Sequence, residues 1–308
     1  MYISKLLIFT IASSASLFIP HKHEEQTIYI RRGADKAEQV DILRQVTSMP
    51  RAICLVLTYI KFRHGEYLIP ANVSGWNLIR IILQSRTVQR KLTIPEGLSV
   101  KQTLDLIKYC PYLTGNMPSK TPPEGSMIGD TYTFNRGISR SAMINIIVQH
   151  TDTIQNKLWQ SNTSVWQNKT EWLTFASILE KEGKDRRDME EIGGVLWNRL
   201  TKNIRLQVDA TAIYAKTNGM YDQILTWDEL QNKKFSNNVD FQSKYNTYAN
   251  KGLPPTPIAN PSIQALEVAL YPKKSKFLYY RLVNGKHIFT KSFDMHKQCA
   301  NKAYNLSE

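Results

Sequence analysis

The sequence predicts an α+β protein whose chain begins with a membrane-targeting segment, and three observations carry that prediction. Uncharged, mostly apolar residues run from Leu6 to Pro20, helical apolar spacing recurs through the second half, and Asn284-Gly285 separates two strand-like segments. An Asn-Gly pair between such segments is the strongest short-range signal for a β-hairpin. Helices mixed with a hairpin indicate an α+β fold.

Length, charge and cysteine content narrow the class of protein. A chain of 308 residues with 42% hydrophobic and 21% charged residues is long enough for two domains and is not disordered. Lys and Arg number 40 against 26 Asp and Glu, so the net charge of +14 favours nucleic acid, anionic lipid or an acidic envelope polymer as partner. Three scattered cysteines, Cys54, Cys110 and Cys299, allow at most one disulfide and exclude a C-x-x-C zinc or redox site.

The apolar segment Leu6–Pro20, called the leader below, indicates which of those partners is expected. Its 15 residues would form a helix of roughly 22 Å, and Tyr2, Ile3 and a snorkelling Lys5 extend it toward the roughly 30 Å of a bilayer core. Small residues from Ala12 to Ser16 also suit signal-peptide cleavage, so cleavage stays open. We expect residues 1–20 to be a transmembrane anchor or uncleaved signal, single-pass in the cytoplasmic membrane, with the bulk of the chain on the outer side. Nucleic acid is then not an expected partner.

Strand-like and helical segments alternate in the first half. Period-two alternation predicts strands, and apolar spacing of three and four predicts helices. In order, these are strand Gln26–Ile30, helix Lys36–Val46, strand Tyr67–Ile69, helix Asn77–Leu83, strand Lys91–Ile94 and helix Val100–Lys108. Residues 109–124 carry four prolines and a glycine, which predicts a linker.

The second half is predicted from helical spacing and capping residues. Asp209 and Asn260 each precede a helical segment and are interpreted as N-caps, with Pro261 at the first helical position. The predicted elements are helices Thr170–Lys181, Met189–Leu200, Ala210–Lys216 and Ser262–Leu270, then strands Phe277–Val283 and Lys286–Thr290.

The sequence lacks the common catalytic motifs, so the remaining candidates for catalytic groups are carboxylates on apolar helices. The sequence has no H-E-x-x-H, G-x-S-x-G, P-loop or G-x-G-x-x-G motif, and we expect no metal and no cofactor. One helix has a broad apolar face made by Trp172, Phe175, Ile178 and Leu179.

Glu182 lies at the edge of that apolar face, at the carboxyl end of the helix. Desolvation and the negative end of the helix dipole both favour its protonated form, which is the form a general acid needs. Glu180 points to the other margin of the face. The alternative is that both are solvated surface residues, one of them paired with Arg186 or Arg187.

Ordered motifs along nearly the whole chain resemble the endolytic murein transglycosylase (YceG-like) family. Matching segments are Ala176–Glu182 (A-S-I-x-E-K-E), Val195–Leu200, Leu206–Thr211, Tyr245–Tyr248 (Y-N-T-Y), Gly252–Ile258 with Asn260-Pro261, Phe277–Tyr280, His287–Phe289 with His296, Pro95–Gly97, and Glu124-Gly125 with Asp130–Tyr132. Two positions depart from the family pattern: Gly183 stands where Thr or Ser is usual, and Ala210 replaces a proline.

The resemblance implies a lyase that cleaves the MurNAc–GlcNAc β-1,4 bond of nascent peptidoglycan strands. In this family a single carboxylic acid catalyses the cleavage, which uses no water and produces 1,6-anhydro-MurNAc ends. The cleavage terminates strand elongation. The motif assigns this role to Glu182, with Glu180 as the alternative. A non-catalytic peptidoglycan-binding envelope adaptor is the alternative function.

Other family positions are interpreted as substrate-binding or structural. Substrate-binding roles are expected for Gln207, Asp209, Tyr245, Asn246 and Tyr248. Each could equally be a satisfied buried polar group. Arg199 is expected to brace a carboxylate through a bidentate pair, and His287 to be structural.

The resemblance also divides the chain. Residues 26–108 resemble a LysM-like α/β region, which either docks on glycan or acts as a spacer above the membrane. Residues 109–124 are the linker, and residues 125–308 form the mixed α+β catalytic domain. Expected partners are peptidoglycan glycan strands, the membrane, and peptidoglycan synthases or division proteins.

Overall fold

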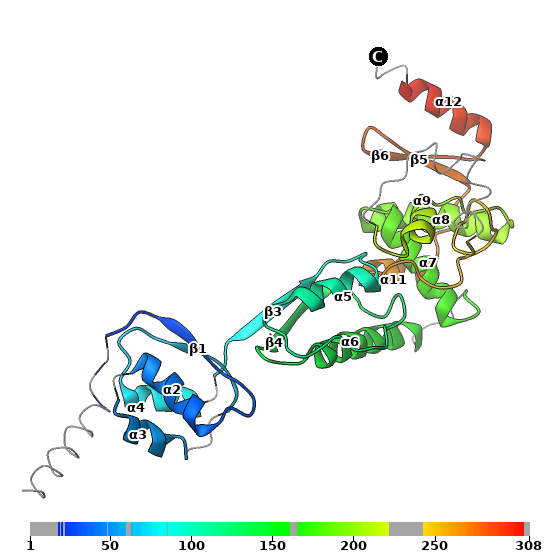
Figure 1. The fold of residues 1–308 in the computed structure, drawn as a ribbon. Coiled ribbons are helices and arrows are strands. Elements are labelled where there is room, and N and C mark those ends of the chain that lie inside the picture. Colours follow the sequence, from blue (N-terminus) through cyan, green and yellow to red (C-terminus); the bar gives the residue numbers. More distant parts are fainter. Residues whose placement is uncertain are drawn as a thin grey trace, which may run out of the picture. The chain divides into compact units, whose positions relative to one another are not determined.

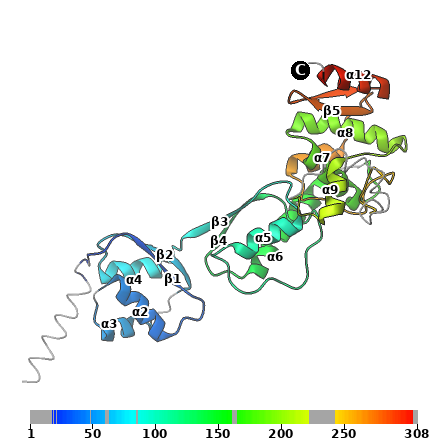
Figure 2. The same ribbon diagram turned by 45° about the horizontal axis from the view of Figure 1, so that its top comes forward.

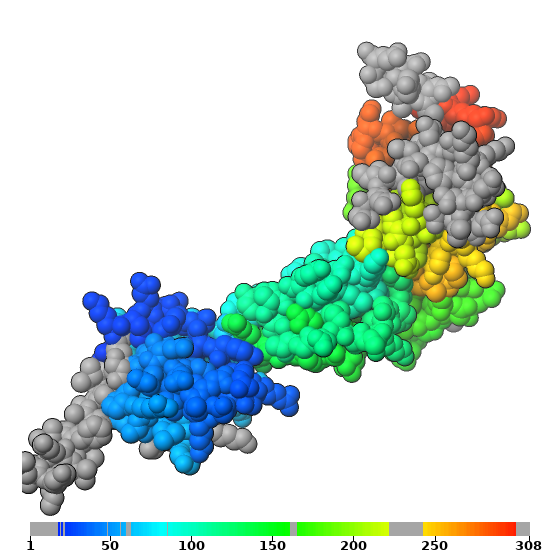
Figure 3. All heavy atoms as spheres, viewed as in Figure 1, coloured from blue at the N-terminus to red at the C-terminus, as the bar shows by residue number. Residues whose placement is uncertain are grey.

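The computed structural model describes most of the chain after the apolar leader. The described residues are 18, 20, 22–47, 49–59, 63–84, 86–160, 165–221 and 243–304, and the others are grey in Figure 3. Most of the predicted anchor, residues 1–17, lies outside them. Among the described helices, none is both long and apolar enough to cross a bilayer. Unit 1 comprises residues 1–92, 110–116 and 133–140, and unit 2 comprises residues 93–109, 117–132 and 141–308.

Unit 1 packs helices against a two-stranded antiparallel sheet. Its elements are β1 (Gln26–Ile30), α2 (Lys36–Val46), α3 (Arg51–Leu57), β2 (Gly65–Ile69) and α4 (Gly75–Leu83) (Figure 1). Ile28 of β1 lies opposite Tyr67 of β2. Both side chains join a buried apolar cluster with residues of α2 and α4, such as Leu43 and Leu78.

A buried ion cluster ties β2 to the following strand. Glu66 is fully buried and accepts two hydrogen bonds from Arg90, at 2.7 Å from both Nε and Nη2. Arg136 donates a third from Nη1 at 3.0 Å, and its guanidinium lies 4.7 Å from the ring centroid of Tyr29. The hydrogen bond from Arg90 is the main cause that lowers the pKa of Glu66. Glu66 is therefore held as a carboxylate.

In the chain, two strands and two helices follow the sheet of unit 1 and precede α7. Strands β3 (Gln89–Ile94) and β4 (Asp130–Asn135) pair with each other, and the boundary between the two units falls within both. Helices α5 (Val100–Tyr109) and α6 (Arg140–Gln160) follow β3 and β4 respectively.

Unit 2 is layered. Besides α5 and nearly all of α6, its elements are α7 (Lys169–Glu182), α8 (Arg186–Thr201), α9 (Asp209–Thr217), α11 (Ile263–Leu270), β5 (Tyr279–Val283), β6 (Lys286–Thr290) and α12 (Phe293–Tyr304). Figures 1 and 2 both show α8 between α7 and the hairpin of β5 and β6. The carboxyl end of α7 nevertheless reaches the hairpin, because Tyr280 of β5 contacts Glu182.

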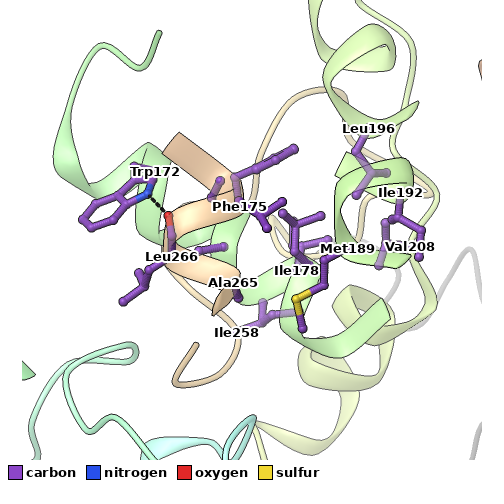
Figure 4. Packing of buried hydrophobic residues seen from close by; sticks show 14 of the residues in the cluster. Trp172, Phe175, Ile178, Met189, Ile192, Leu196, Val208, Ile258, Ala265 and Leu266 are labelled. Atoms are coloured by element: carbon purple, nitrogen blue, oxygen red, sulfur yellow. Dashed lines mark hydrogen bonds between the residues drawn. The ribbon is translucent and has the colours of Figure 1, made fainter. Parts of the chain in front are cut away.

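The core of unit 2 is built on the predicted apolar face of α7. Trp172, Phe175, Ile178 and Leu179 are all fully buried, which confirms that face. Figure 4 shows Trp172, Phe175 and Ile178 packed against α8 and α11. The indole nitrogen of Trp172 donates to the carbonyl of Leu266 at 2.9 Å. Dense packing on this face fixes the direction in which the carboxyl end of α7 points.

The hairpin and the mixed α+β class are confirmed. Tyr279–Val283 and Lys286–Thr290 pair antiparallel. Asn284 (φ 48°) and Gly285 (φ 73°) supply the two positive φ angles that a tight turn of this kind requires. The predicted strand Gln26–Ile30 and helix Lys36–Val46 are confirmed at both ends, and the three cysteines are free thiols.

Both predicted N-caps are wrong. Helix α9 begins at Asp209, its N-cap is Val208, and no side chain caps it. Helix α11 has Ser262 as N-cap, and its side chain accepts from the amide of Ala265. Pro261 therefore precedes the cap instead of opening the helix.

Asn260 is used elsewhere. Its Oδ1 accepts from the amide of Met127 at 2.9 Å, and its Nδ2 donates to the carbonyl of Leu98 at 2.8 Å. Buried backbone groups of distant loops need partners, and the amide of Asn260 satisfies one donor and one acceptor at once.

Candidate active site

Glu182 is the last residue of α7. Gly183 ends the helix with an extended backbone, and its amide donates to the carbonyl of Leu179 at 2.9 Å. A Cβ at position 183 would lie 2.5 Å from Cγ and 2.9 Å from the backbone nitrogen of Met189. The chain turns into α8 so closely that a Cβ at this position would require Met189 to shift.

The carboxyl of Glu182 is held by a tyrosine. Tyr280, on β5, donates from its hydroxyl to Oε2 of Glu182 at 2.7 Å. The pKa of Glu182 is raised to about 7, mainly by burial; the hydrogen bond from Tyr280 and the charge of His287 act against this rise, and the charge of Asp209 adds to it. The residue nevertheless keeps some accessible surface. A carboxyl that is half protonated near neutral pH and still reachable can both give and take a proton.

The hairpin presents a face of aromatic side chains. Tyr280 lies opposite Phe289 and Leu282 lies opposite His287, so these four residues share one face of the hairpin. The rings of Tyr280 and His287 are 5.8 Å apart and meet edge to face.

A second contact fixes the hairpin to α8. Nδ1 of His287 lies 2.7 Å and 2.9 Å from the two carboxylate oxygens of Asp188, in the first turn of α8. Both side chains are about nine-tenths buried. The pair holds the strand that carries Tyr280, and the structural interpretation of His287 agrees with this contact.

Asp209 lies near Glu182, and its carboxylate accepts a hydrogen bond from a second tyrosine. Tyr248 donates from its hydroxyl to Oδ1 of Asp209. The segment that carries Tyr248 is held at the start of α9, because Oγ1 of Thr247 accepts from the amide of Val208 at 3.0 Å and lies 2.8 Å from Oγ1 of Thr211. The Y-N-T-Y and L-Q-x-D motifs are therefore neighbours in space, and Asp209 contributes negative charge rather than a helix cap.

Arg199 holds Gln207 instead of a carboxylate, so its predicted bidentate brace is wrong. Its Nη2 donates to Oε1 of Gln207 and its Nη1 to the carbonyl of Leu206, both at 2.7 Å. Gln207 has a φ of 55°, a left-handed conformation that is unfavourable for a residue with a Cβ. Its side chain is exposed, and its Nε2 has no partner among the described residues. The buried guanidinium thus orients the side-chain amide of Gln207 through its oxygen.

Glu180 performs a structural task. Its Oε2 accepts from the amide of Ser262 at 2.9 Å, at the start of α11. Burial raises its pKa as well, but its carboxyl is occupied by the backbone of α11. Arg186 pairs with Glu190 and Glu267, and not with Glu180 or Glu182. Geometry therefore favours Glu182 over Glu180 as the proton-transferring group.

The predicted site residues fall into two groups. Glu182, Asp209 and Tyr248 lie together, and Gln207 is linked to the same region through Arg199.

The other two predicted residues, Tyr245 and Asn246, hold their own loop. The hydroxyl of Tyr245 is 2.7 Å from Oγ1 of Thr256, and Oδ1 of Asn246 accepts from the amide of Tyr248 at 2.9 Å. Their substrate-binding roles stay predictions.

Sequence reasoning missed Tyr280 and Asp188. The sequence indicates Tyr280 only as part of a family motif, and no sequence pattern marks Asp188. Alternation along the predicted hairpin could have placed Tyr280 and His287 on one face, but no local signal indicates that this face meets the end of α7.

The fold and the site define a class of protein: an α+β protein with one proton-bearing carboxyl at a helix end, facing a tyrosine and a second carboxylate. The chain belongs to the YceG-like family, whose sequence profile matches residues 28–302. The family resemblance read from the motifs is thereby confirmed.

Named relatives and a solved structure agree with that assignment. The chain is 33% identical over 193 residues to the endolytic murein transglycosylase of Bacillus subtilis (strain 168), with 61% of this chain and 49% of the relative covered. It is 30% identical over 264 residues to the protein of the same name from Streptococcus pneumoniae serotype 2 (strain D39), with 72% and 47% covered. A crystal structure of a putative YceG-like protein from Listeria monocytogenes matches with a TM-score of 0.58 and 29% identity, covering 89% of this chain and 98% of that one. The chain spans about half the length of the two curated relatives.

Proposed function

We propose that this protein is an endolytic lytic transglycosylase that cuts the MurNAc–GlcNAc β-1,4 bond within nascent peptidoglycan strands and so terminates their elongation. The observation that carries the proposal is the Glu182 carboxyl, whose pKa is raised to about 7 and which accepts a hydrogen bond from Tyr280. The names of the relatives support the same substrate.

One carboxyl is sufficient for this chemistry. Protonated Glu182 gives its proton to the glycosidic oxygen as the bond from that oxygen to C1 of MurNAc breaks. The resulting carboxylate takes the proton of the MurNAc 6-hydroxyl while that oxygen bonds to C1. The products are a free GlcNAc hydroxyl and a 1,6-anhydro-MurNAc end, Glu182 is again protonated, and no water is consumed.

The neighbours of Glu182 suit the two halves of this cycle. Burial and the charge of Asp209 favour the acid form that starts the reaction. The Tyr280 hydroxyl stabilises the carboxylate that exists between the two proton transfers. The negative charge of Asp209 also stabilises positive charge that develops at C1.

Substrate binding is assigned to the polar groups around this centre. Nε2 of Gln207 is free to donate to a sugar hydroxyl or acetamido oxygen, because Arg199 holds the other side of the amide. Tyr248 offers a ring face for a sugar, and Tyr245 and Asn246 complete the proposed binding segment.

The remaining parts of the proposal concern location and domains. Residues 1–20 anchor the chain in the cytoplasmic membrane with the bulk outside, residues 26–108 form a LysM-like region, residues 109–124 a linker and residues 125–308 the catalytic domain. The strand-helix-helix-strand order of β1, α2, α3 and β2 supports the LysM-like interpretation. Peptidoglycan synthases or division proteins are proposed as further partners.

The test is a digestion of purified peptidoglycan followed by mass spectrometry of the products. Wild-type protein is expected to release fragments with 1,6-anhydro-MurNAc ends from inside strands, and Glu182→Gln to release almost none. Binding to peptidoglycan without any anhydro ends from wild type would replace this proposal with the adaptor function. Products with reducing ends would show hydrolysis and would contradict the single-acid mechanism.

A further inference from the structure

Positive charge is concentrated in unit 1. Unit 1 contains fifteen Lys or Arg against six Asp or Glu, so it carries +9 of the total +14 on about a third of the residues. The catalytic chemistry proposed above uses only unit 2. The excess charge of unit 1 therefore has no role in that site, and it matches a polyanionic partner of its own.

Helix α4 has two apolar faces, and only one of them is covered. Gly75, Leu78, Ile79 and Ile82 are buried against the rest of unit 1. About a quarter turn around the helix from this buried face, Trp76 is 55% exposed and Leu83 is 52% exposed, one helical repeat apart, with exposed Arg80 between them. Trp and Leu interspersed with Arg on a solvent-facing stripe are typical of a helix that lies at a membrane interface.

A cavity of about 450 Å³ opens beside this stripe. Its lining residues are Pro70, Ala71, Asn72, Val73, Asn77, Arg80, Ile81, Gln84 and Arg86. No Asp or Glu is among these lining residues, and neither Arg80 nor Arg86 has an ion-pair or hydrogen-bond partner for its guanidinium among the described residues. Two unpaired guanidinium groups and three side-chain amides match the oxygens of a phosphate group.

The end of the apolar leader is fixed next to the same helix. Pro20 forms a β-bridge with Ser74, the N-cap of α4. The ring of Phe18 lies 6.4 Å from that of Trp76. The uncharged run that ends at Pro20 therefore leads directly to the exposed stripe, and a leader seated in a bilayer would bring α4 to its surface.

We propose that the exposed stripe of α4 and the adjoining cavity form a binding site for an anionic phospholipid of the bilayer. Arg80 and Arg86 hold the lipid phosphate in the cavity, and Trp76 and Leu83 enter the interface between headgroups and acyl chains. The site goes beyond the lytic function and rests on the proposed membrane location of the leader. Its consequence is that unit 1 lies against the bilayer surface rather than hanging freely from its anchor.

The test titrates the full chain in a nonionic detergent with dioctanoyl phosphatidylglycerol, dioctanoyl phosphatidylcholine or inorganic phosphate, followed by calorimetry. We expect phosphatidylglycerol to bind at least about tenfold more tightly than either of the others. The double variant Arg80→Gln/Arg86→Gln is expected to weaken that binding by about thirtyfold, since each arginine near an anionic surface contributes on the order of 1 kcal/mol. Trp76→Ala is expected to weaken it by about tenfold.

The matched control is Arg32→Gln/Arg51→Gln, which removes the same charge from exposed positions of unit 1 that do not line the cavity. It should bind within about twofold of wild type. Equal loss in both double variants, or equal affinity for the two lipids, would overturn the proposal. Inorganic phosphate binding as tightly as phosphatidylglycerol would make the cavity a free-phosphate site instead.

Two measurements separate this proposal from the others. The melting temperature of each variant shows whether it is folded. Substitution of exposed arginines should not change this temperature. Digestion of detergent-solubilised glycan strands should be unchanged in Arg80→Gln/Arg86→Gln, because the residues around Glu182 all belong to unit 2. If the wild-type protein shows no lytic activity, the proposed function is wrong. The lipid titration would still test the lipid-binding site independently.

Discussion

Units 1 and 2 each bury a glutamate, and their surroundings push the two carboxyls toward opposite protonation states. Glu66 in unit 1 is hydrogen-bonded by Arg90 and Arg136, and its pKa is lowered. Glu182 in unit 2 is hydrogen-bonded by the neutral hydroxyl of Tyr280, and its pKa is raised to about 7.

The hydrogen-bond partners of the two carboxyls differ in charge: two guanidinium groups donate to Glu66, and a neutral hydroxyl donates to Glu182. Desolvation favours the neutral acid at both positions, but cations that donate to Glu66 outweigh desolvation, whereas one neutral donor to Glu182 does not. Glu66 is thus fixed as a structural anion, and Glu182 is left free to exchange its proton.

The largest expected effect on activity separates Glu182 from Glu180. Glu182→Gln should lower the rate of anhydro-end formation by about a thousandfold or more, because an amide cannot transfer the proton. Glu180→Gln should cost less than about tenfold, since its amide oxygen can still accept from Ser262. Initial rates on purified peptidoglycan measure both, and a larger loss at Glu180 would exchange the two roles.

Breaking the ion cluster of unit 1 is expected to have the next largest effect. Glu66→Gln leaves Arg90 and Arg136 without their anion and should destabilise unit 1 by about 2–4 kcal/mol. Hydrogen exchange of peptides from β1 and β2 reports on this unit alone.

The control for the ion cluster is Glu38→Gln, which breaks an exposed pair with Arg31. It should cost less than about 1 kcal/mol. Equal protection in both variants would mean that the buried cluster contributes no more than a surface pair.

The two glutamates should give the units opposite pH dependences. The lowered pKa of Glu66 stabilises unit 1 above about pH 4.5, and this contribution is lost as the pH falls through the folded pKa. The raised pKa of Glu182 stabilises unit 2 below about pH 4.5, and this contribution is lost as the pH rises toward 7. Hydrogen exchange measured as a function of pH gives the free energy of unfolding of each unit. In Glu66→Gln, the slope of this free energy against pH should be reduced on the acid side for unit 1. In Glu182→Gln, the slope for unit 2 should be reduced between pH 4.5 and 7. Slopes of the same sign in the two units would contradict the comparison.

Removing the tyrosine donor sharpens the same comparison at the active site. Tyr280→Phe removes a bond to the charged form of Glu182, so the pKa should rise further. Because Glu182 must be protonated to start the reaction, the loss of activity on the alkaline side should move upward by about one pH unit, which a pH–rate profile measures. Tyr279→Phe is the control, since that ring packs against Phe293 and His296 instead. An unshifted profile in Tyr280→Phe would remove Tyr280 from the mechanism.

The smallest expected effect concerns the turn after Glu182. Gly183→Ala should destabilise unit 2 by about 1–3 kcal/mol, because its Cβ collides with Met189. Gly193→Ala in α8 is the control: its Cβ would find ordinary contacts of 3.6 Å with Leu179, so the change should be neutral or slightly stabilising. Thermal unfolding compares the two, and equal melting temperatures would mean that the turn adjusts freely.

Local patterns in the sequence were sufficient for much of the fold and for the acid itself. The period of three and four along α7 put Trp172 and Phe175 in the core and Glu182 at the edge of their face, and Asn284-Gly285 located the hairpin. These signals succeed because they depend on residues a few positions apart, whose spacing on a helix or turn is fixed by backbone geometry.

Tertiary structure alone decided which partner each polar group takes. Tyr280 reaches Glu182 across 98 positions of sequence, and Asn260 reaches Leu98 across 162. Capping propensity wrongly predicted helix caps at Asn260 and Asp209, because a buried amide or carboxylate pairs with whatever donor or acceptor the folded chain brings to it. The same reason separates Glu180 from Glu182: their helix places them two residues apart, and only the packing of α11 and the hairpin assigns one to structure and leaves the other free for chemistry.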